Sequence, residues 1–185
     1  MSLTEKNAKI LLKVAKESIM SGLETQKPKT VELSDYDEEL RQIRATFVTL
    51  ESYKHLRGCI GTLIAHRPLV SDVAYHAYAA AFSDPRFPKL ERLEYPALEI
   101  KISILSPSEP ISFDSEADLI QQLRPGIDGL ILSDGVHKGT FLPSVWESLP
   151  ESRDFLQHLK QKAGLSSDYW SNTIKIERYT AEYIS

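Results

Sequence analysis

In the segment LEIKISIL, residues 98–105, apolar and polar side chains alternate from Leu98 to Ile104. Successive side chains of a strand point to opposite faces, so Leu98 and the three isoleucines line one face while Glu99, Lys101 and Ser103 line the other. This alternation predicts a strand in a sheet with one face on a core and one face in water, which is typical of antiparallel sheets.

Two further segments have the composition of β-hairpins. Residues 44–52 and 58–65 are rich in β-branched side chains and flank the polar stretch YKHLR, and residues 129–135 and 137–145 flank a turn at Asp134-Gly135. Each hairpin precedes a helical pattern and a further strand, and the tail at 173–183 supplies the last strand. We therefore expect an α+β fold, with a mostly antiparallel sheet, flanking helices and a duplicated β-hairpin and helix unit. No G-x-G-x-x-G is present, and strands and helices do not alternate as in a Rossmann domain.

The helices are indicated by spacing and by end signals. A capping box of Ser2 and Glu5 opens a first helix that Gly22 ends. Pro68 opens a second helix that runs to residue 82, and shorter helices are expected at 116–123 and 155–163.

Composition excludes several classes of protein. With 22 basic and 26 acidic residues the net charge is −4, which disfavours nucleic acid as a partner. The single cysteine excludes an internal disulfide and a cysteine-rich zinc site, and the histidines lack metal-ligand spacing, so we assign no metal. The longest apolar run, 77–82, is too short to cross a membrane, and lysines interrupt any signal-like segment, so a cytoplasmic location is expected.

The single cysteine lies in the segment HLRGCIG, residues 55–61. If the segment is a regular strand, His55, Arg57 and Cys59 share one face, where the guanidinium favours the thiolate and the imidazole accepts its proton. Gly58 and Gly61 would leave the sulfur accessible. In the alternative interpretation Cys59 is a small buried hydrophobe, and a bulge at Gly58 breaks the shared face.

A second candidate group lies at the end of the helix that Pro68 opens. Asp84 and Arg86 place a carboxylate and a guanidinium on a loop that prolines stiffen, where they could pair with Arg57 or hold an acidic ligand. The alternative is a capped, salt-bridged turn at a helix end.

The segment LRGCIGT, residues 56–62, resembles the hallmark of the AMMECR domain, which in prokaryotes is called AmmeMemoRadiSam system protein A. The resemblance runs from about residue 8 to the C-terminus, so we expect residues 1–185 to form a single AMMECR domain. Other segments follow in the family's order, and they are AAFSDPRFPKL, ISILSP, GIDGLIL, GTFLPSVW and LKQKAGL.

This resemblance implies a compact α+β protein of two unequal lobes with the hallmark strand near their cleft. It implies no settled activity and names no cofactor; it implies an association with Memo-like and radical-SAM proteins. The family's motif residues fall on Arg57, Gly58, Cys59, Gly61 and Thr62, and on Asp84, Arg86, Phe87 and Pro88. His55 lies outside the hallmark.

Three functions follow as hypotheses. The first is an enzyme-like component that binds a small or terminal anionic group, with Cys59 and His55 as catalytic residues and with Arg57, Gly58, Gly61, Thr62, Asp84 and Arg86 in the binding site. The second is a non-catalytic adaptor that docks on a Memo-like or radical-SAM partner through the glycine-rich face. The third and least favoured is RNA binding.

Overall fold

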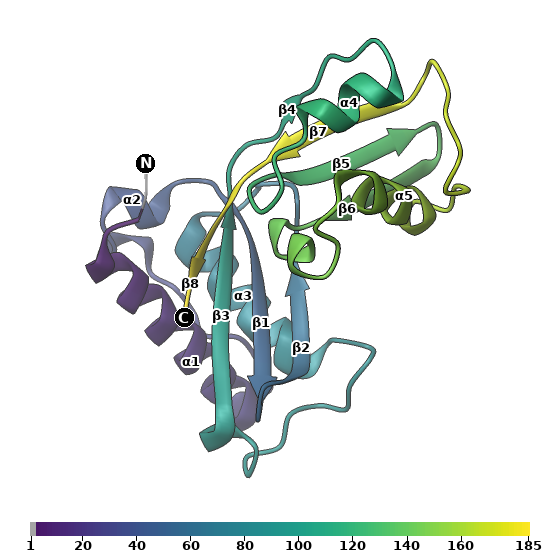
Figure 1. Ribbon diagram of the computed structural model, residues 1–185. Helices are drawn as coiled ribbons and strands as arrows, with labels where there is room; N and C mark the ends of the chain where they lie inside the picture. Colours follow the sequence, from purple (N-terminus) through teal and green to yellow (C-terminus); the bar gives the residue numbers. More distant parts are fainter. Residues whose placement is uncertain (1–2) are drawn as a thin grey trace. The chain divides into compact units, whose positions relative to one another are not determined.

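The computed structural model describes residues 3–185 and forms an α+β fold of two compact units, each built on a four-stranded antiparallel sheet (Figure 1). Unit 1 comprises the chain up to Leu105 together with Glu182–Ser185, and unit 2 comprises Ser106–Ala181. The α+β class and the unequal sizes of the two units confirm the prediction from the sequence.

Unit 1 contains a sheet of strand order β2-β1-β3-β8 with two long helices on one face (Figure 1). The elements of unit 1 are α1 (Glu5–Thr25), η1 (Leu33–Asp35), α2 (Glu38–Arg41), β1 (Ala45–Ser52), β2 (His55–Gly61), α3 (Leu69–Phe82), η2 (Tyr95–Ala97), β3 (Leu98–Leu105) and β8 (Ala181–Ile184). Of these, η1, α2 and η2 are short helical turns.

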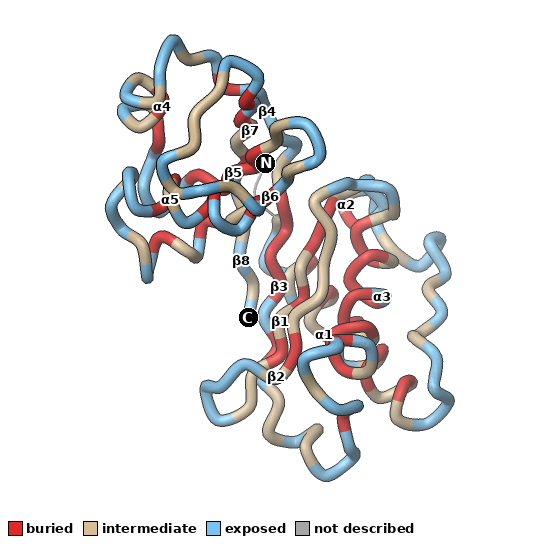
Figure 2. Tube along the Cα trace, turned by 90° about the vertical axis from the view of Figure 1, so that its right-hand side faces the viewer, coloured by how far each residue is buried: buried red, intermediate tan, exposed pale blue. Residues whose placement is uncertain are grey.

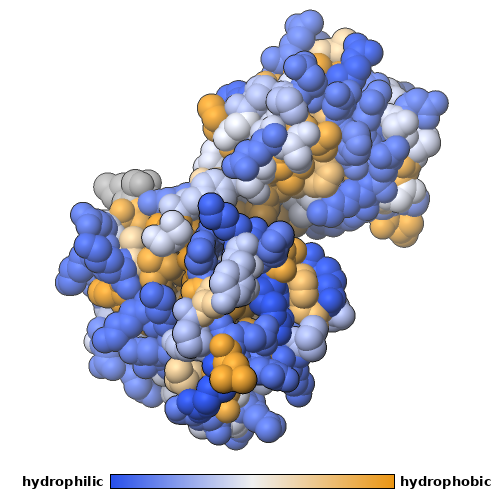
Figure 3. Space-filling view, turned by 60° about the horizontal axis from the view of Figure 1, so that its bottom comes forward, coloured by the Kyte–Doolittle hydropathy of each residue, from blue (hydrophilic) through white to orange (hydrophobic). Residues whose placement is uncertain are grey.

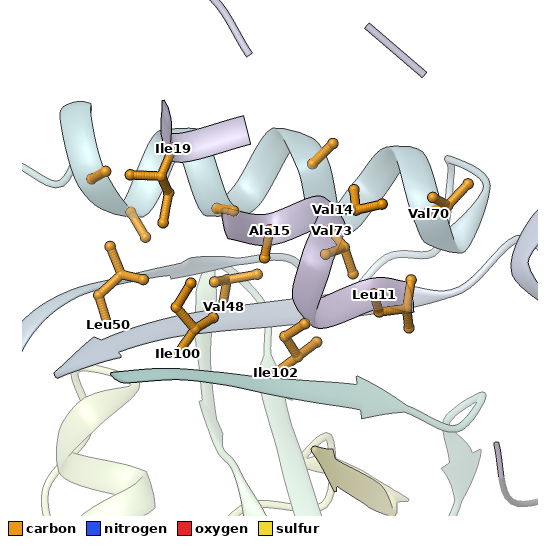
Figure 4. Close-up of a cluster of buried hydrophobic side chains, with 14 of the residues drawn as sticks. Leu11, Val14, Ala15, Ile19, Val48, Leu50, Val70, Val73, Ile100 and Ile102 are labelled. Carbon is orange, nitrogen blue, oxygen red and sulfur yellow. The ribbon is translucent and has the colours of Figure 1, made fainter. Parts of the chain in front are cut away.

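The core of unit 1 lies between this sheet and the helices α1 and α3 (Figure 4). Its side chains come from every second residue of β1 and β3 and from one face of each helix. The labelled members include Leu11, Val14 and Ile19 of α1, Val70 and Val73 of α3, and Val48, Leu50, Ile100 and Ile102 of the strands. The alternation predicted for residues 98–105 is therefore confirmed on the core face. On the other face Glu99 and Lys101 are exposed, whereas Ser103 is buried.

The ends of α1 differ from the expected ones. Thr4 is the N-cap, and its hydroxyl accepts a hydrogen bond from the backbone N–H of Asn7; Ser2 lies outside the described residues. The helix continues past Gly22, whose Cα packs against the ring of Phe82, and it ends before Gln26, which holds a positive φ of 59°.

Unit 2 contains a sheet of order β4-β7-β5-β6 and a separate core. In that core the rings of Trp146 and Phe155 stack with centroids 3.8 Å apart, and the indole N–H donates to the carbonyl of Asp128. The elements of unit 2 are β4 (Glu109–Pro110), α4 (Glu116–Gln122), β5 (Gly129–Asp134), β6 (His137–Phe141), η3 (Pro143–Glu147), α5 (Ser152–Lys162) and β7 (Lys175–Tyr179).

The two units repeat one topology. In each unit a hairpin is followed by a helix and then by a strand that pairs with the first strand of the hairpin, which gives the orders β2-β1-β3 and β6-β5-β7. The duplicated hairpin and helix unit predicted from the sequence is thus present.

The C-terminal segment expected as one strand is divided at Thr180. Strand β7 belongs to the sheet of unit 2 and β8 to that of unit 1. Thr180 accepts a hydrogen bond from the N–H of Ser106, and its own N–H donates to the Ser106 hydroxyl, both at 2.9 Å. Because Thr180 bonds to Ser106, it belongs to neither strand, and the segment is divided there into β7 and β8.

Burial follows the layers of each unit. Most of α3 and the central strands are buried, while loops are exposed (Figure 2). Figure 3 shows a face on which hydrophilic residues predominate and apolar ones form small separate groups. Within residues 3–185 no helix combines the length and apolar character that spanning a membrane requires.

Candidate functional site

The hallmark strand β2 forms one edge of the unit 1 sheet, and its two glycines are close-packing positions. A Cβ on Gly58 would lie 2.1 Å from the carbonyl oxygen of Ala80 in α3, and one on Gly61 would lie 2.3 Å from the ring of Phe47. Both spaces are therefore occupied by this chain's own atoms. The glycines bring β2 against α3 and under an aromatic ring, and neither leaves an open surface at its Cα.

A register shift in β2 separates two residues expected to act together. Cys59 lies opposite Thr49, but Leu56 lies opposite Glu51, which leaves Arg57 as an extra residue in the ladder. Directly paired residues share a face, so His55, opposite Ser52, falls on the face of Leu50, and Cys59 falls on the other face. The expectation of one face shared by His55, Arg57 and Cys59 is wrong because the bulge changes the parity of the strand. The alternative, a bulge that breaks the shared face, is confirmed, although the extra residue is Arg57 and not Gly58.

The main chain of Cys59 is held from outside the sheet. Its N–H donates to Asp84 Oδ2 at 2.9 Å, and its carbonyl oxygen accepts from Arg86 Nη2 at 3.3 Å. These two side chains satisfy the edge groups that a neighbouring strand would otherwise pair. We call this arrangement the Asp84–Arg86 clamp.

Within the clamp the two side chains form a bidentate pair. Arg86 Nε donates to Asp84 Oδ1 at 3.0 Å and Nη2 donates to Oδ2 at 2.7 Å, while the Arg86 backbone N–H also donates to Oδ1. The Asp84 side chain is 2% exposed. Hydrogen bonding to Arg86 holds the pKa of Asp84 well below its usual range, and the pKa of Arg86 is raised. The salt-bridged turn considered from the sequence is therefore present, and it also binds the hallmark strand.

Arg57 is engaged by a carboxylate that sequence reasoning missed. Its Nε and Nη2 donate to the two carboxylate oxygens of Glu94 at 2.6 and 3.0 Å, and its side chain is only 11% exposed. The hydrogen bonds with Glu94 raise the pKa of Arg57 and lower that of Glu94. The guanidinium carbons of Arg57 and Arg86 lie 5.9 and 5.5 Å from the ring centroid of Phe87. Arg57 therefore fastens the loop after α3 to β2.

The sulfur of Cys59 lies on the sheet face that α1 and α3 do not cover. Cys59 is half-buried, and its Sγ is 3.2 Å from the hydroxyl of Thr49, the residue directly opposite on β1. No sequence signal distinguished Thr49 from other strand threonines; only the register brings it to the sulfur. Thr62 lies past the end of β2, where its hydroxyl accepts from the N–H of Ile64 in a turn.

The arrangement offers a thiol, a neighbouring hydroxyl and one accessible guanidinium. Arg86 is 55% exposed, and the hydrogen bonds of its guanidinium use Nε and Nη2, which leaves Nη1 to meet a ligand. Within residues 3–185 there is no cluster of three or more His, Cys, Asp or Glu side chains that could hold a metal ion.

Comparison with known proteins agrees with the resemblance seen in the hallmark. The sequence model of the AMMECR1 family matches residues 12–184. A protein of Methanothermobacter thermautotrophicus is 33% identical over 186 residues, covering 97% of this chain and 94% of that protein. Protein MJ0810 of Methanocaldococcus jannaschii is 35% identical over 162 residues, covering 83% and 79%.

A solved structure shows the same architecture. The crystal structure of the uncharacterized protein PH0010 from Pyrococcus horikoshii superposes with a TM-score of 0.89 at 32% sequence identity, covering 99% of this chain and 93% of that one. The match takes in both units together with the hallmark strand. The chain belongs to the AMMECR1 family.

Proposed function

We propose that this chain is a cytoplasmic, enzyme-like component, a single AMMECR domain, that binds a small or terminal anionic group beside the Cys59 sulfur. The observation that carries the proposal is the Asp84–Arg86 clamp, which fixes the Cys59 main chain while its sulfur stays on the helix-free face. In this role Cys59 acts as nucleophile or covalent anchor.

The anion contact is assigned to Arg86. Its guanidinium is bonded to the carbonyl of Cys59 and is more than half exposed, so a ligand at the sulfur can reach Nη1 without breaking the clamp. Arg57 is nearly buried and both its Nε and Nη2 are taken by Glu94, so it supports the loop that carries Arg86. His55 belongs to the other face, and proton transfer in this proposal uses the Thr49 hydroxyl or water.

The test compares alkylation of Cys59 by iodoacetate and by iodoacetamide, which differ by one negative charge. Cys59 is the only cysteine, so labelling reports one site. The rate ratio of iodoacetate to iodoacetamide should be roughly fivefold higher in the native protein than in urea, because a guanidinium near the sulfur attracts the anion. Measuring both rates against pH gives the titration of the thiol in the same experiment.

Arg86→Gln should abolish that preference. Arg124→Gln is the matched control, because the Nε and Nη2 of Arg124 also bond a buried aspartate, both at Oδ1 of Asp128, and Arg124 is 49% exposed but lies in unit 2. A native Cys59 that is inert to both reagents, or that shows the denatured ratio, contradicts the proposal.

An adaptor that docks on Memo-like or radical-SAM proteins is the second candidate, and the β1–β2 turn favours it. Tyr53 and Lys54 hold positive φ angles of 50° and 65°, which asparagine and glycine adopt at lower cost, and Tyr53 is 81% exposed. Replacing the pair by Asn-Gly should stabilise the fold and weaken capture of a purified Memo-like or radical-SAM partner. Equal capture by the variant and the wild type counts against docking through this turn.

A further inference from the structure

The two sheets repeat their register as well as their strand order. A methyl group on Gly58 would meet the backbone of Ala80 in α3, and one on Gly139 would meet the backbone of Ala163, the C-cap residue of α5. Two cross-strand rows correspond, and they are Gly58–Leu50–Ile100 in unit 1 and Gly139–Leu132–Ile176 in unit 2. Counting from these rows, Cys59 of unit 1 is equivalent to Thr140 of unit 2, and Ser103 is equivalent to Tyr179.

In unit 2 the two equivalent side chains meet. The Tyr179 hydroxyl lies 3.1 Å from Thr140 Oγ1 and donates to the carbonyl oxygen of Phe141 at 3.0 Å. The phenol ring crosses Gly129, where a Cβ would lie 2.4 Å from it. Tyr179 thereby fills the surface between β7 and β6 with a side chain of this chain.

In unit 1 the equivalent surface lacks that side chain. Ser103 is 7% exposed, yet its hydroxyl has no hydrogen-bond partner among residues 3–185. In the described chain, the side-chain polar atoms that are fully buried without a partner are Asn7 Oδ1 and Arg57 Nη1. The Ser103 hydroxyl is not one of them, so solvent still reaches it. Phe47 of β1 pairs directly with both Ser103 and Gly61, so it stands where unit 2 has Gly129. Its ring lies over Gly61, on the side of β2, and carries no hydroxyl.

A solvent-reachable hydroxyl that no group of the described chain bonds can instead bond a ligand that displaces the water there. We propose that Ser103 contacts the ligand of the Cys59 site, and that this ligand carries a phenol-like hydroxyl that reaches Ser103. The assignment rests on the proposed function, and it names a substrate class, a hydroxylated ring joined to an anionic group.

The span between the two residues fits this ligand. Cys59 on β2 and Ser103 on β3 are separated by β1, about 10 Å at about 5 Å for each pair of strands, and by two residues along the strands, about 7 Å. Their main chains are therefore roughly 12 Å apart. A phenol ring bridges the corresponding distance in unit 2. The Thr49 hydroxyl, beside the sulfur, lies along the same path.

The experiment uses two electrophiles that differ only by a hydroxyl, phenacyl bromide and 4-hydroxyphenacyl bromide. In both reactions the Cys59 sulfur bonds to the methylene carbon, bromide leaves and the thiol proton passes to solvent. The quantity measured is the ratio of the two alkylation rates, 4-hydroxyphenacyl bromide over phenacyl bromide. This ratio should be roughly fivefold higher for native Cys59 than for the urea-denatured protein, which is the gain expected from one hydrogen bond.

Ser103→Ala should remove that preference and leave the iodoacetate preference in place. Ser52→Ala is the matched control, since Ser52 lies on the same sheet but on the opposite face, at the far end of β1. Unfolding in urea verifies that both variants fold.

The outcomes separate the two proposals. A wild type without any preference for the hydroxylated reagent, or a preference that survives Ser103→Ala, overturns the assignment of Ser103. If the iodoacetate preference is nevertheless present and depends on Arg86, the proposed function stands. Loss of the iodoacetate preference in the wild type overturns the proposed function and this inference with it.

Discussion

Unit 1 and unit 2 use the same cross-strand row of glycine, leucine and isoleucine, but they pack its glycine at different distances from the following helix. A Cβ on Gly58 would lie 2.1 Å from the backbone oxygen of Ala80, whereas one on Gly139 would lie 3.0 Å from the nitrogen of Ala163. The edge strand is thus drawn closer to its helix in unit 1. Apolar packing sets the register that the two units share. The edge strands β2 and β6 differ in how closely they approach the helix that follows them.

The buried aspartates show the same contrast. Asp128 of unit 2 accepts hydrogen bonds from the backbone and guanidinium of Arg124, which closes a local turn. Asp84 of unit 1 closes a similar turn with Arg86 and in addition accepts the N–H of Cys59, a residue far away in sequence. In unit 1 the aspartate that closes the turn therefore also holds the main chain of the hallmark strand.

The largest effect is expected from adding a methyl group at the tighter glycine. Gly58→Ala should lower the free energy of unfolding by about 3 kcal/mol, because the new Cβ meets helix backbone that cannot rotate away. Gly139→Ala should cost about 1 kcal/mol, because shifts of a few tenths of an ångström relieve its contacts. Urea unfolding of both variants measures the difference, and equal losses would show that the two rows are packed alike.

The next effect comes from neutralising the two aspartates. Asp84→Asn should cost about 2 kcal/mol, because an amide has one acceptor oxygen where the carboxylate has two, and its NH2 group cannot accept from Arg86 or Cys59. The exposure of Arg86 limits the penalty. The substitution should also speed the alkylation of Cys59 by iodoacetamide. Asp128→Asn should destabilise the protein and leave the alkylation rate of Cys59 unchanged. If both variants alkylate faster by the same factor, the Asp84–Arg86 clamp does not control access to Cys59.

The clamp also predicts the acid side of the stability curve. The pKa of Asp84 is depressed in the folded state, chiefly by its hydrogen bonds with Arg86. Its stabilising contribution is therefore complete above the unfolded pKa, roughly 4, and is lost as the pH falls through the lower folded value. Urea unfolding between neutral pH and about pH 3 should show a shallower decline for Asp84→Asn than for the wild type. A slope remains in the variant because the pKa of Glu94 is also depressed.

The fold was largely predictable because its signals are local. Alternation in residues 98–105, Pro68 before α3 and the two hairpin patterns each fix a strand or a helix by short-range rules. The division of the C-terminal strand was not predictable, since Thr180 leaves the ladder through bonds to Ser106, distant in sequence.

The candidate site was predictable only in its composition. Cys59, Arg57, Asp84 and Arg86 were identified, but their pairing depends on register and on loop geometry. A single extra residue in β2 moved His55 to the other face. The strand glycine Gly58 suggested a bulge as an alternative, but no periodicity in the sequence decides between a bulge and a regular strand. Glu94 resembled any other charge of a polar loop until the fold brought it to Arg57.

The smallest effect, and the sharpest comparison, is expected from the two equivalent hydroxyl positions. Tyr179→Phe should cost about 1 kcal/mol, because it removes the hydroxyl that bonds to Phe141 and lies beside Thr140. Ser103→Ala should change the free energy of unfolding by less than about 0.5 kcal/mol, because its hydroxyl has no partner to lose among residues 3–185. Both values come from urea unfolding at neutral pH. A loss at Ser103 as large as that at Tyr179 would mean that the fold itself satisfies this hydroxyl, which would leave nothing at Ser103 for a ligand to supply.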